Sequence, residues 1–166
     1  MSLNNFSYSV SWSDFTSKPS RPHGEDEDAR IKISYPYSYD LGRNKNAIIV
    51  SAAEMNIGTV SVACWAVSSQ MSNDLLAHEQ GHYDITALGA REFYNTLLTL
   101  SAKSEKDIKA AIKKENGKIQ KKIDEVNKLY DDKTDHSQNK SVQQQWNKQI
   151  AAEKQKPNGS LNSLPQ

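Results

Sequence analysis

A chain of 166 residues with a formal net charge of +1 is long enough for one domain with a modest core. The balance of charges gives no electrostatic reason to expect nucleic acid or a membrane surface as a partner. No stretch approaches the roughly 18 apolar residues of a membrane span, and Met1–Phe6 lacks the basic and apolar regions of a signal peptide. The single cysteine, Cys64, excludes an internal disulfide, and its apolar neighbours predict a packing role.

Alternation in the first half of the chain predicts strands. Apolar and polar residues alternate at 6–12 and again at 31–35, while 47–50 and 60–67 are apolar and rich in β-branched residues. Between the first two segments, residues 18–29 contain two prolines, one glycine and four acidic residues, which predicts an exposed loop. We therefore expect a mostly antiparallel sheet of three to five strands.

Helical patterns begin after this region. Ser72 or Asn73 can cap a helix that runs from about residue 74 to residue 100. Ser104, followed three residues later by Asp107, resembles a capping box and opens a second long helix that extends to about residue 130.

The last part of the chain is expected to turn back. A polar break at 131–139 follows the second helix, and apolar residues at helical spacing predict a shorter third helix around 142–150. The composition of residues 156–166 predicts a disordered tail. The expected organisation is thus one domain, 1–155, followed by this tail.

The feature with the clearest chemistry is the motif HEQGH at residues 78–82, which matches HExxH. Positions four apart lie on one face of a helix, so His78 and His82 can bind one zinc ion. Glu79 is offset from His78 by about 100°, beside the metal, where it can act as the general base on a zinc-bound water. The motif lies within the predicted first helix, as this mechanism requires.

A catalytic zinc usually has three protein ligands, so one more must come from outside the motif. The metzincin pattern is excluded because position 88 is leucine. His136 lies in the polar break, which a helical hairpin can return to the metal, whereas Glu92 is about 15 Å along the same helix and too distant. Asp84 points away from the face that carries His78 and His82. From the residues alone the third ligand therefore stays open among four candidates: His23, His136, Asp132 and Asp135.

Several segments, in order along the chain, are similar to one known family. They are Val10–Phe15, Cys64–Val67, Leu75–Ile85, Ala90–Arg91, Tyr130–Asp131 with Thr134 and His136, and Gln144–Trp146. The chain resembles a bacterial zinc-dependent protease family, known mainly as a domain of unknown function, in the wider zincin group. One departure is Ser137, which stands where the family commonly has glycine and is expected to alter the local turn.

The resemblance implies an α+β, zincin-like fold. A small, mostly antiparallel sheet would pack on a long HExxH helix, which a helical hairpin and a short third helix would follow. It also implies His136 as the third zinc ligand, and a periplasmic or secreted location. Zincins also pair the substrate with an edge strand, here 60–67 or 47–53, and use a residue that stabilises the oxyanion, for which Tyr35, Tyr83 and Tyr130 are candidates.

Three functions are compatible with these features. The favoured one is a zinc-dependent metallohydrolase, specifically a peptidase, with His78, His82 and His136 on Zn²⁺ and Glu79 as general base. Its partner would be a peptide or protein substrate, with no nucleic acid, no membrane and an oligomeric state that the sequence leaves open. The alternatives are a zinc-stabilised, non-catalytic binding module and a metal-free helical adaptor. The intact Glu79 argues against the binding module, because a structural zinc site does not need that carboxylate.

Overall fold

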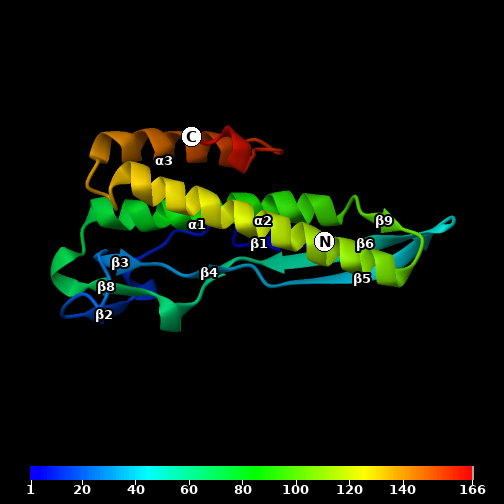
Figure 1. The fold of residues 1–166 in the computed structure, drawn as a ribbon, viewed down its shortest axis with the longest axis horizontal. Coiled ribbons are helices and arrows are strands. Elements are labelled where there is room, and N and C mark those ends of the chain that lie inside the picture. The colour runs from blue at the N-terminus through cyan, green and yellow to red at the C-terminus, as the bar shows by residue number, and fades with distance from the viewer. Residues whose placement is uncertain (166) are drawn as a thin grey trace.

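The computed structural model describes residues 1–165, which form three long helices and nine short strands. The helices are α1 (Asn73–Leu97), α2 (Glu105–Thr134) and α3 (Lys140–Gln155). Figure 1 shows them side by side, with the strands together on one side of this helical layer. The helical part of the chain therefore closely follows the three segments that the sequence predicts.

Side-chain caps define where the helices begin. Ser72 accepts a hydrogen bond from the Leu75 N–H at 3.2 Å, at the start of α1. Ser104 accepts from the Asp107 N–H at 3.2 Å and starts α2. Each cap satisfies a backbone donor that the first turn of a helix leaves free. The predicted helix starts are confirmed.

The largest sheet has four strands: β1 (Ser2–Asn4), β5 (Tyr37–Asn44), β6 (Ala47–Asn56) and β9 (Ser101–Ala102). Its order is β1-β6-β5, and β9 pairs with the other end of β6. The β5–β6 hairpin is antiparallel, whereas β1 runs parallel to β6.

The remaining strands form two smaller sheets. In one, β8 (Trp65–Val67) lies between β2 (Thr16–Lys18), to which it is parallel, and β3 (Ala29–Arg30), to which it is antiparallel. In the other, β4 (Ile33–Ser34) pairs with β7 (Gly58–Thr59). The segment between β3 and β4 therefore runs along the edge of both small sheets.

The expected zincin-like architecture is wrong. The strands form three sheets instead of one small, mostly antiparallel sheet, and two of their pairings are parallel. The helices do not pack on a single long HExxH helix: α2 is the longest, with 30 residues against 25 in α1, and it also packs against α3. Residues 6–12, expected as a strand, form none, because the strand pairing of this region falls to Ser2–Asn4 and Thr16–Lys18.

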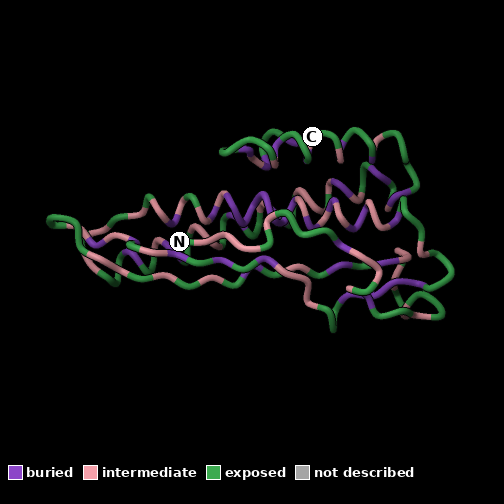
Figure 2. Tube along the Cα trace, turned by 180° about the vertical axis from the view of Figure 1, so that it is seen from behind, coloured by how far each residue is buried: buried purple, intermediate pink, exposed green. Residues whose placement is uncertain are grey.

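The end of the chain also differs from the expectation of disorder. Leu161 and Leu164 are buried, and Arg91 of α1 donates hydrogen bonds to the carbonyl oxygens of Glu153, Lys154 and Gly159 at 2.9–3.2 Å. The two buried leucines and these hydrogen bonds together hold the segment on the core. Residue 166, the last of the expected tail, lies outside the described residues. Figure 2 shows the buried positions recurring along the helices and strands where they face one another.

Candidate metal centre

The two histidines of the HEQGH motif face the same side of α1, as their spacing predicts. Their ring centroids are 4.7 Å apart, with the planes at 89°, and the two Nε2 atoms are 3.2 Å apart. His78 is only 3% exposed, and the side chain of His82 is 13% exposed. The helix therefore delivers both imidazoles to one partly buried point.

Hydrogen bonds from α2 fix which ring nitrogen of each histidine faces this point. His82 Nδ1 lies 2.8 Å from Asn127 Oδ1 and donates to it. Thr134 Oγ1 donates to the Tyr130 carbonyl oxygen at 2.7 Å, so it accepts from His78 Nδ1 at 3.4 Å. A histidine that donates through Nδ1 keeps its Nε2 lone pair for a metal. Both Nε2 atoms are thus prepared as ligands.

Asp131, also on α2, completes the closest group. Its Oδ1 is 3.1 Å from His78 Nε2 and 2.8 Å from His82 Nε2. Ligand atoms of these three residues all lie within 4.8 Å of one another. The candidates for a third ligand that the sequence suggests include the neighbouring Asp132 but not Asp131.

A signal for Asp131 was present in the sequence. Asn127, Asp131 and Thr134 are spaced by four and three residues, which places them on one face of a helix. The sequence predicts that the second helix ends near residue 130, which assigns Asp131 and Thr134 to the polar break and hides their alignment with Asn127. The helix in fact continues to Thr134.

His136, predicted as the third zinc ligand, lies beside this group without being a member of it. Its Nδ1 is 3.8 Å from Asp131 Oδ1 and 3.9 Å from Glu27 Oε2, and within residues 1–165 this buried atom has no hydrogen-bond partner. Its side chain is 38% exposed. The structure thus brings His136 to the rim of the site.

The turn that carries His136 has an unusual backbone. Asp135, His136 and Ser137 have φ values of 50°, 46° and 80°, the left-handed region that favours glycine. The predicted effect of a serine at position 137 on the local turn therefore has a structural basis, because Ser137 adopts a conformation that a glycine would adopt without strain. The turn reverses the chain between α2 and α3.

The other candidates for a third ligand lie elsewhere. Asp84 pairs with Lys154, and Glu92 pairs with Lys122. The remaining three are exposed: His23, Asp132 and Asp135. None of them joins the group formed by His78, His82 and Asp131 in the part of the chain that the structure describes.

Glu79 is buried beside the imidazoles. It is 2% exposed, and its Oε2 has no hydrogen-bond partner within residues 1–165. Burial raises the pKa of Glu79 to about 7; the charge of His82 opposes this rise, and the charges of Glu27 and Asp131 add to it. A carboxyl group with this pKa can accept and return a proton near neutral pH.

The two histidines have unlike protonation behaviour. Burial lowers the pKa of His78. Burial also acts to lower the pKa of His82, but the hydrogen bond and charge of Asp131, with the charge of Glu79, outweigh it and raise this pKa to about 9. For Asp131, burial acts to raise the pKa, and the hydrogen bonds from both histidines hold it well below its usual range. The carboxylate of Asp131 therefore favours the protonated form of His82.

This donor set fits a zinc ion. Two imidazole nitrogens and one carboxylate oxygen converge within 4.8 Å, and such acceptors repel one another unless a cation or a proton lies between them. Without a metal, the proton on His82 meets this need. Imidazole and carboxylate are ordinary ligands of zinc, and the buried Nδ1 of His136, which has no partner among residues 1–165, is one more donor nearby.

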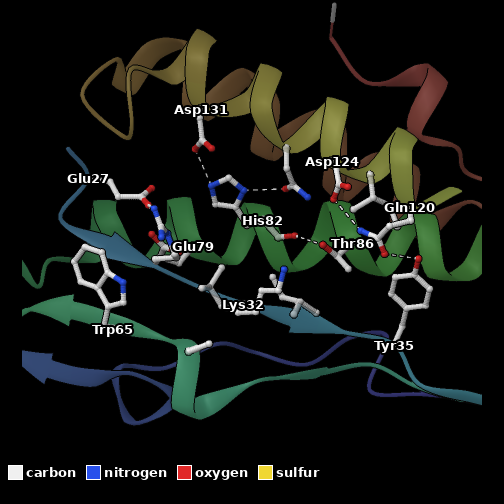
Figure 3. Close-up of a pocket in the computed structure, with 16 residues that line it drawn as sticks. Glu27, Lys32, Tyr35, Trp65, Glu79, His82, Thr86, Gln120, Asp124 and Asp131 are labelled. Atoms are coloured by element: carbon white, nitrogen blue, oxygen red, sulfur yellow. Dashed lines mark hydrogen bonds and ion pairs between the residues drawn. The ribbon is translucent and has the colours of Figure 1, made fainter. Parts of the chain in front are cut away.

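A cavity of about 620 Å³ opens beside this group. Its walls come from α1, from α2 and from the segment at residues 30–35. Figure 3 shows His82 at its centre, Glu27 and Glu79 together toward one end and Tyr35 at the other. Glu27, which pairs with Arg30, comes from the acidic loop at 18–29; no motif in the sequence connected it with the site.

The three tyrosines considered for stabilising an oxyanion have different surroundings. Tyr83 donates to the Asn5 carbonyl oxygen at 2.8 Å, and Tyr130 donates to Asn147 at 3.1 Å, so both hydroxyls are bound away from the cavity. Tyr35 lines the cavity and donates to Gln120 at 2.7 Å, and burial raises its pKa to about 12. Of the three, Tyr35 alone remains a candidate.

The other side of the HEQGH segment anchors the start of the chain. Gln80 accepts from the Val10 N–H at 2.8 Å and donates to the Tyr8 carbonyl oxygen at 3.1 Å. Gln80 also donates to Asp84 at 3.1 Å. Gln80 thus ties the segment around Val10 to the helix that carries the motif.

Fold and site together define an α+β protein with a candidate metal centre between two helices and beside a cavity. The chain belongs to the bacterial family described as "Bacterial protein of unknown function (DUF922)", whose profile matches residues 7–139. No curated protein and no solved structure matches the chain. No helix among residues 1–165 has the length and apolar character to cross a membrane.

Proposed function

We propose that this protein is a zinc-dependent metallohydrolase that cleaves peptide bonds. The observation that carries the proposal is the convergence of His78 Nε2, His82 Nε2 and Asp131 Oδ1 within 4.8 Å, next to Glu79 and a cavity. A purely structural zinc site is usually closed by a fourth protein ligand. This group instead borders open space, which favours chemistry.

His78, His82 and Asp131 would hold the zinc ion, with His136 as the nearest further donor. The chemistry that zinc supplies when bound is Lewis acidity, which polarises a carbonyl oxygen and lowers the pKa of a water to about 7. Asn127 and Thr134 hold the imidazole Nδ1 protons, so both Nε2 atoms stay available.

Glu79 would carry the proton during the reaction. Glu79 lines the cavity, and its buried Oε2 has no hydrogen-bond partner among residues 1–165. Its raised pKa of about 7 matches a group that takes a proton from water and delivers it to a leaving amine. The positive charge of a nearby metal favours the ionised form and would lower this pKa. Glu79 therefore acts as a base at physiological pH.

The backbone of the segment that lines the cavity supports an extended polypeptide as substrate. Lys32 uses its backbone on the side of the small sheets, donating to Cys64 Sγ at 3.2 Å and accepting from the Val60 N–H at 2.7 Å. Backbone groups alternate in direction along an extended segment, so Ile31 and Ile33, which line the cavity, turn theirs to the opposite side. The Ile31 backbone hydrogen-bonds to Glu79, which leaves that of Ile33 for a substrate. This edge at residues 31–33 is where a substrate strand would pair; it is neither of the two segments that the sequence suggested, 60–67 and 47–53.

The test measures metal binding and cleavage separately. Zinc affinity is measured by competition with a chromophoric chelator for the wild type and for Asp131→Ala and His136→Ala variants. Cleavage of a fluorescently labelled, unfolded casein is then followed with zinc-loaded wild type and the Glu79→Gln variant, and new chain ends are identified by mass spectrometry. We expect the wild type to cleave casein and the Glu79→Gln variant not to cleave it, although both of these proteins bind zinc.

Two outcomes would change the proposal. Cleavage that persists in the Glu79→Gln variant would contradict the assigned base. Tight zinc binding by a wild type that cleaves neither casein nor a library of short peptides would instead favour a zinc-stabilised binding module.

A further inference from the structure

The ring of Tyr130 touches both imidazoles of the candidate metal centre. It stacks on His78 with a centroid distance of 4.7 Å and an interplanar angle of 14°. It meets His82 edge-on, at 5.1 Å and 82°. One rigid ring thus packs against two rings whose own planes are nearly perpendicular, and it restricts the rotation of each.

Gly81, inside the HEQGH motif, provides the space for this ring. A Cβ atom at position 81 would lie 2.4 Å from Tyr130 Oη and 2.6–2.8 Å from two ring carbons, distances that real contacts do not show. Gly81 lies within helix α1 and has no positive φ, so its backbone does not require glycine. A glycine here costs about 1 kcal/mol of helix stability relative to alanine, which indicates that the close approach of Tyr130 is needed.

Helix α3 supports Tyr130 from behind. Trp146 packs against it at 5.3 Å with a 57° tilt, and Asn147 accepts the hydrogen bond of its hydroxyl. Both Tyr130 and Trp146 are almost fully buried, at 0% and 1% exposure. A continuous contact therefore runs from α3 through Tyr130 to the two histidines.

We propose that Tyr130 is a positioning residue that sets the ring orientations of His78 and His82, and that Gly81 is glycine to admit it. The inference rests on the proposed metal function, because oriented imidazoles matter most for a ligand held at both Nε2 atoms. It gives Trp146 a role in the site through Tyr130, without contact to the reacting atoms. Residues that orient metal ligands from outside typically contribute 10–100-fold to metal affinity.

The experiment compares four variants: Tyr130→Leu, Tyr130→Phe, Gly81→Ala and a control, Phe93→Leu. Phe93 is as buried as Tyr130 and packs edge-on against Tyr37, 11 residues beyond His82 on α1 and about 16 Å away. Its loss should destabilise the fold to a similar degree without touching the site. Zinc affinity is measured by chelator competition, and folding by thermal unfolding.

We expect Tyr130→Leu and Gly81→Ala to lower zinc affinity by 10–100-fold, and Tyr130→Phe and Phe93→Leu to stay within about threefold of the wild type. Equal losses in Tyr130→Leu and Phe93→Leu, at matched unfolding temperatures, would overturn the inference by showing that only global stability matters.

A second readout needs no metal. NMR of the imidazole ring protons of metal-free protein reports the stacked aromatic ring directly. Removing Tyr130 should shift the His78 ring protons downfield, as the shielding by the stacked ring is lost, and Phe93→Leu should leave them unchanged. Unmoved His78 resonances in Tyr130→Leu would refute the positioning role. A wild type that shows these ring shifts but binds no zinc would instead refute the proposed metal function and leave the positioning contact standing.

Discussion

Replacing Asp131 with asparagine removes one charge from the centre of the site and leaves the shape of the side chain. In the metal-free protein Asp131 Oδ1 lies 2.8 Å from His82 Nε2 and stabilises the protonated imidazole. The pKa of His82 is therefore raised from 6.5 to about 9. Without the carboxylate only burial remains as the leading effect, so the pKa of His82 should fall to 6.5 or below. NMR titration of the His82 ring protons measures this change.

The same substitution should lower stability in a pH-dependent way. The raised pKa of His82 stabilises the folded protein fully below pH 6.5, and this contribution is lost as the pH rises through about 9. At pH 7 it amounts to about 2 kcal/mol. The depressed pKa of Asp131 reflects the same interaction seen from the carboxylate, so the contribution is also lost in acid, as Asp131 takes up a proton. Wild type and Asp131→Asn should therefore differ most at pH 5–6.5 and converge near pH 10. A difference in unfolding free energy that does not shrink between pH 7 and pH 10 would show that the Asp131–His82 pair does not cause it.

Four further predictions follow from particular contacts. Glu79→Gln should raise the unfolding temperature of the metal-free protein above pH 7, because the raised pKa of about 7 means that the ionised carboxylate is a cost to the fold; calorimetry that finds a lower value would contradict this. Zinc affinity should rise with pH up to about pH 9, as zinc displaces the proton of His82, and isothermal titration in two buffers should show proton release. Ser137→Gly should gain about 1 kcal/mol in urea unfolding, because it relieves a φ of 80°; a loss would show that its side chain matters more. Arg91→Met should cost about 2–4 kcal/mol, because three carbonyl oxygens lose their donor, and unchanged urea unfolding would refute that assignment.

The helices were predictable because their signals are local. Ser72 and Ser104 cap α1 and α2 through contacts within three residues, and apolar spacing outlines the rest. Strand pairing is not local. The pairing of Ser2–Asn4 with β6 spans about 50 residues, and nothing within so short a segment specifies that partner. Three small sheets therefore replaced the single sheet that alternation had suggested.

In the site, too, the residues fixed by local spacing were predictable and those brought in by tertiary packing were not. His78, His82 and Glu79 are fixed by one helix, so the spacing alone placed them correctly relative to one another. Asp131 lies 53 residues away from His78 on another helix, and its contribution depends on how α2 packs against α1. Glu27 comes from an irregular loop, whose position no periodic pattern predicts. His136 remains a prediction, located at the rim of the site.

The most direct test of the metal centre is the zinc content of protein purified without chelators, measured by elemental mass spectrometry. A variant in which His78 and His82 are both alanine is measured in parallel, after both proteins have been offered zinc and desalted. We expect about one zinc ion per wild-type chain and none in the variant. Wild-type protein that stays free of zinc, or a variant that binds as much as the wild type, would contradict the metal centre and with it the proposed activity.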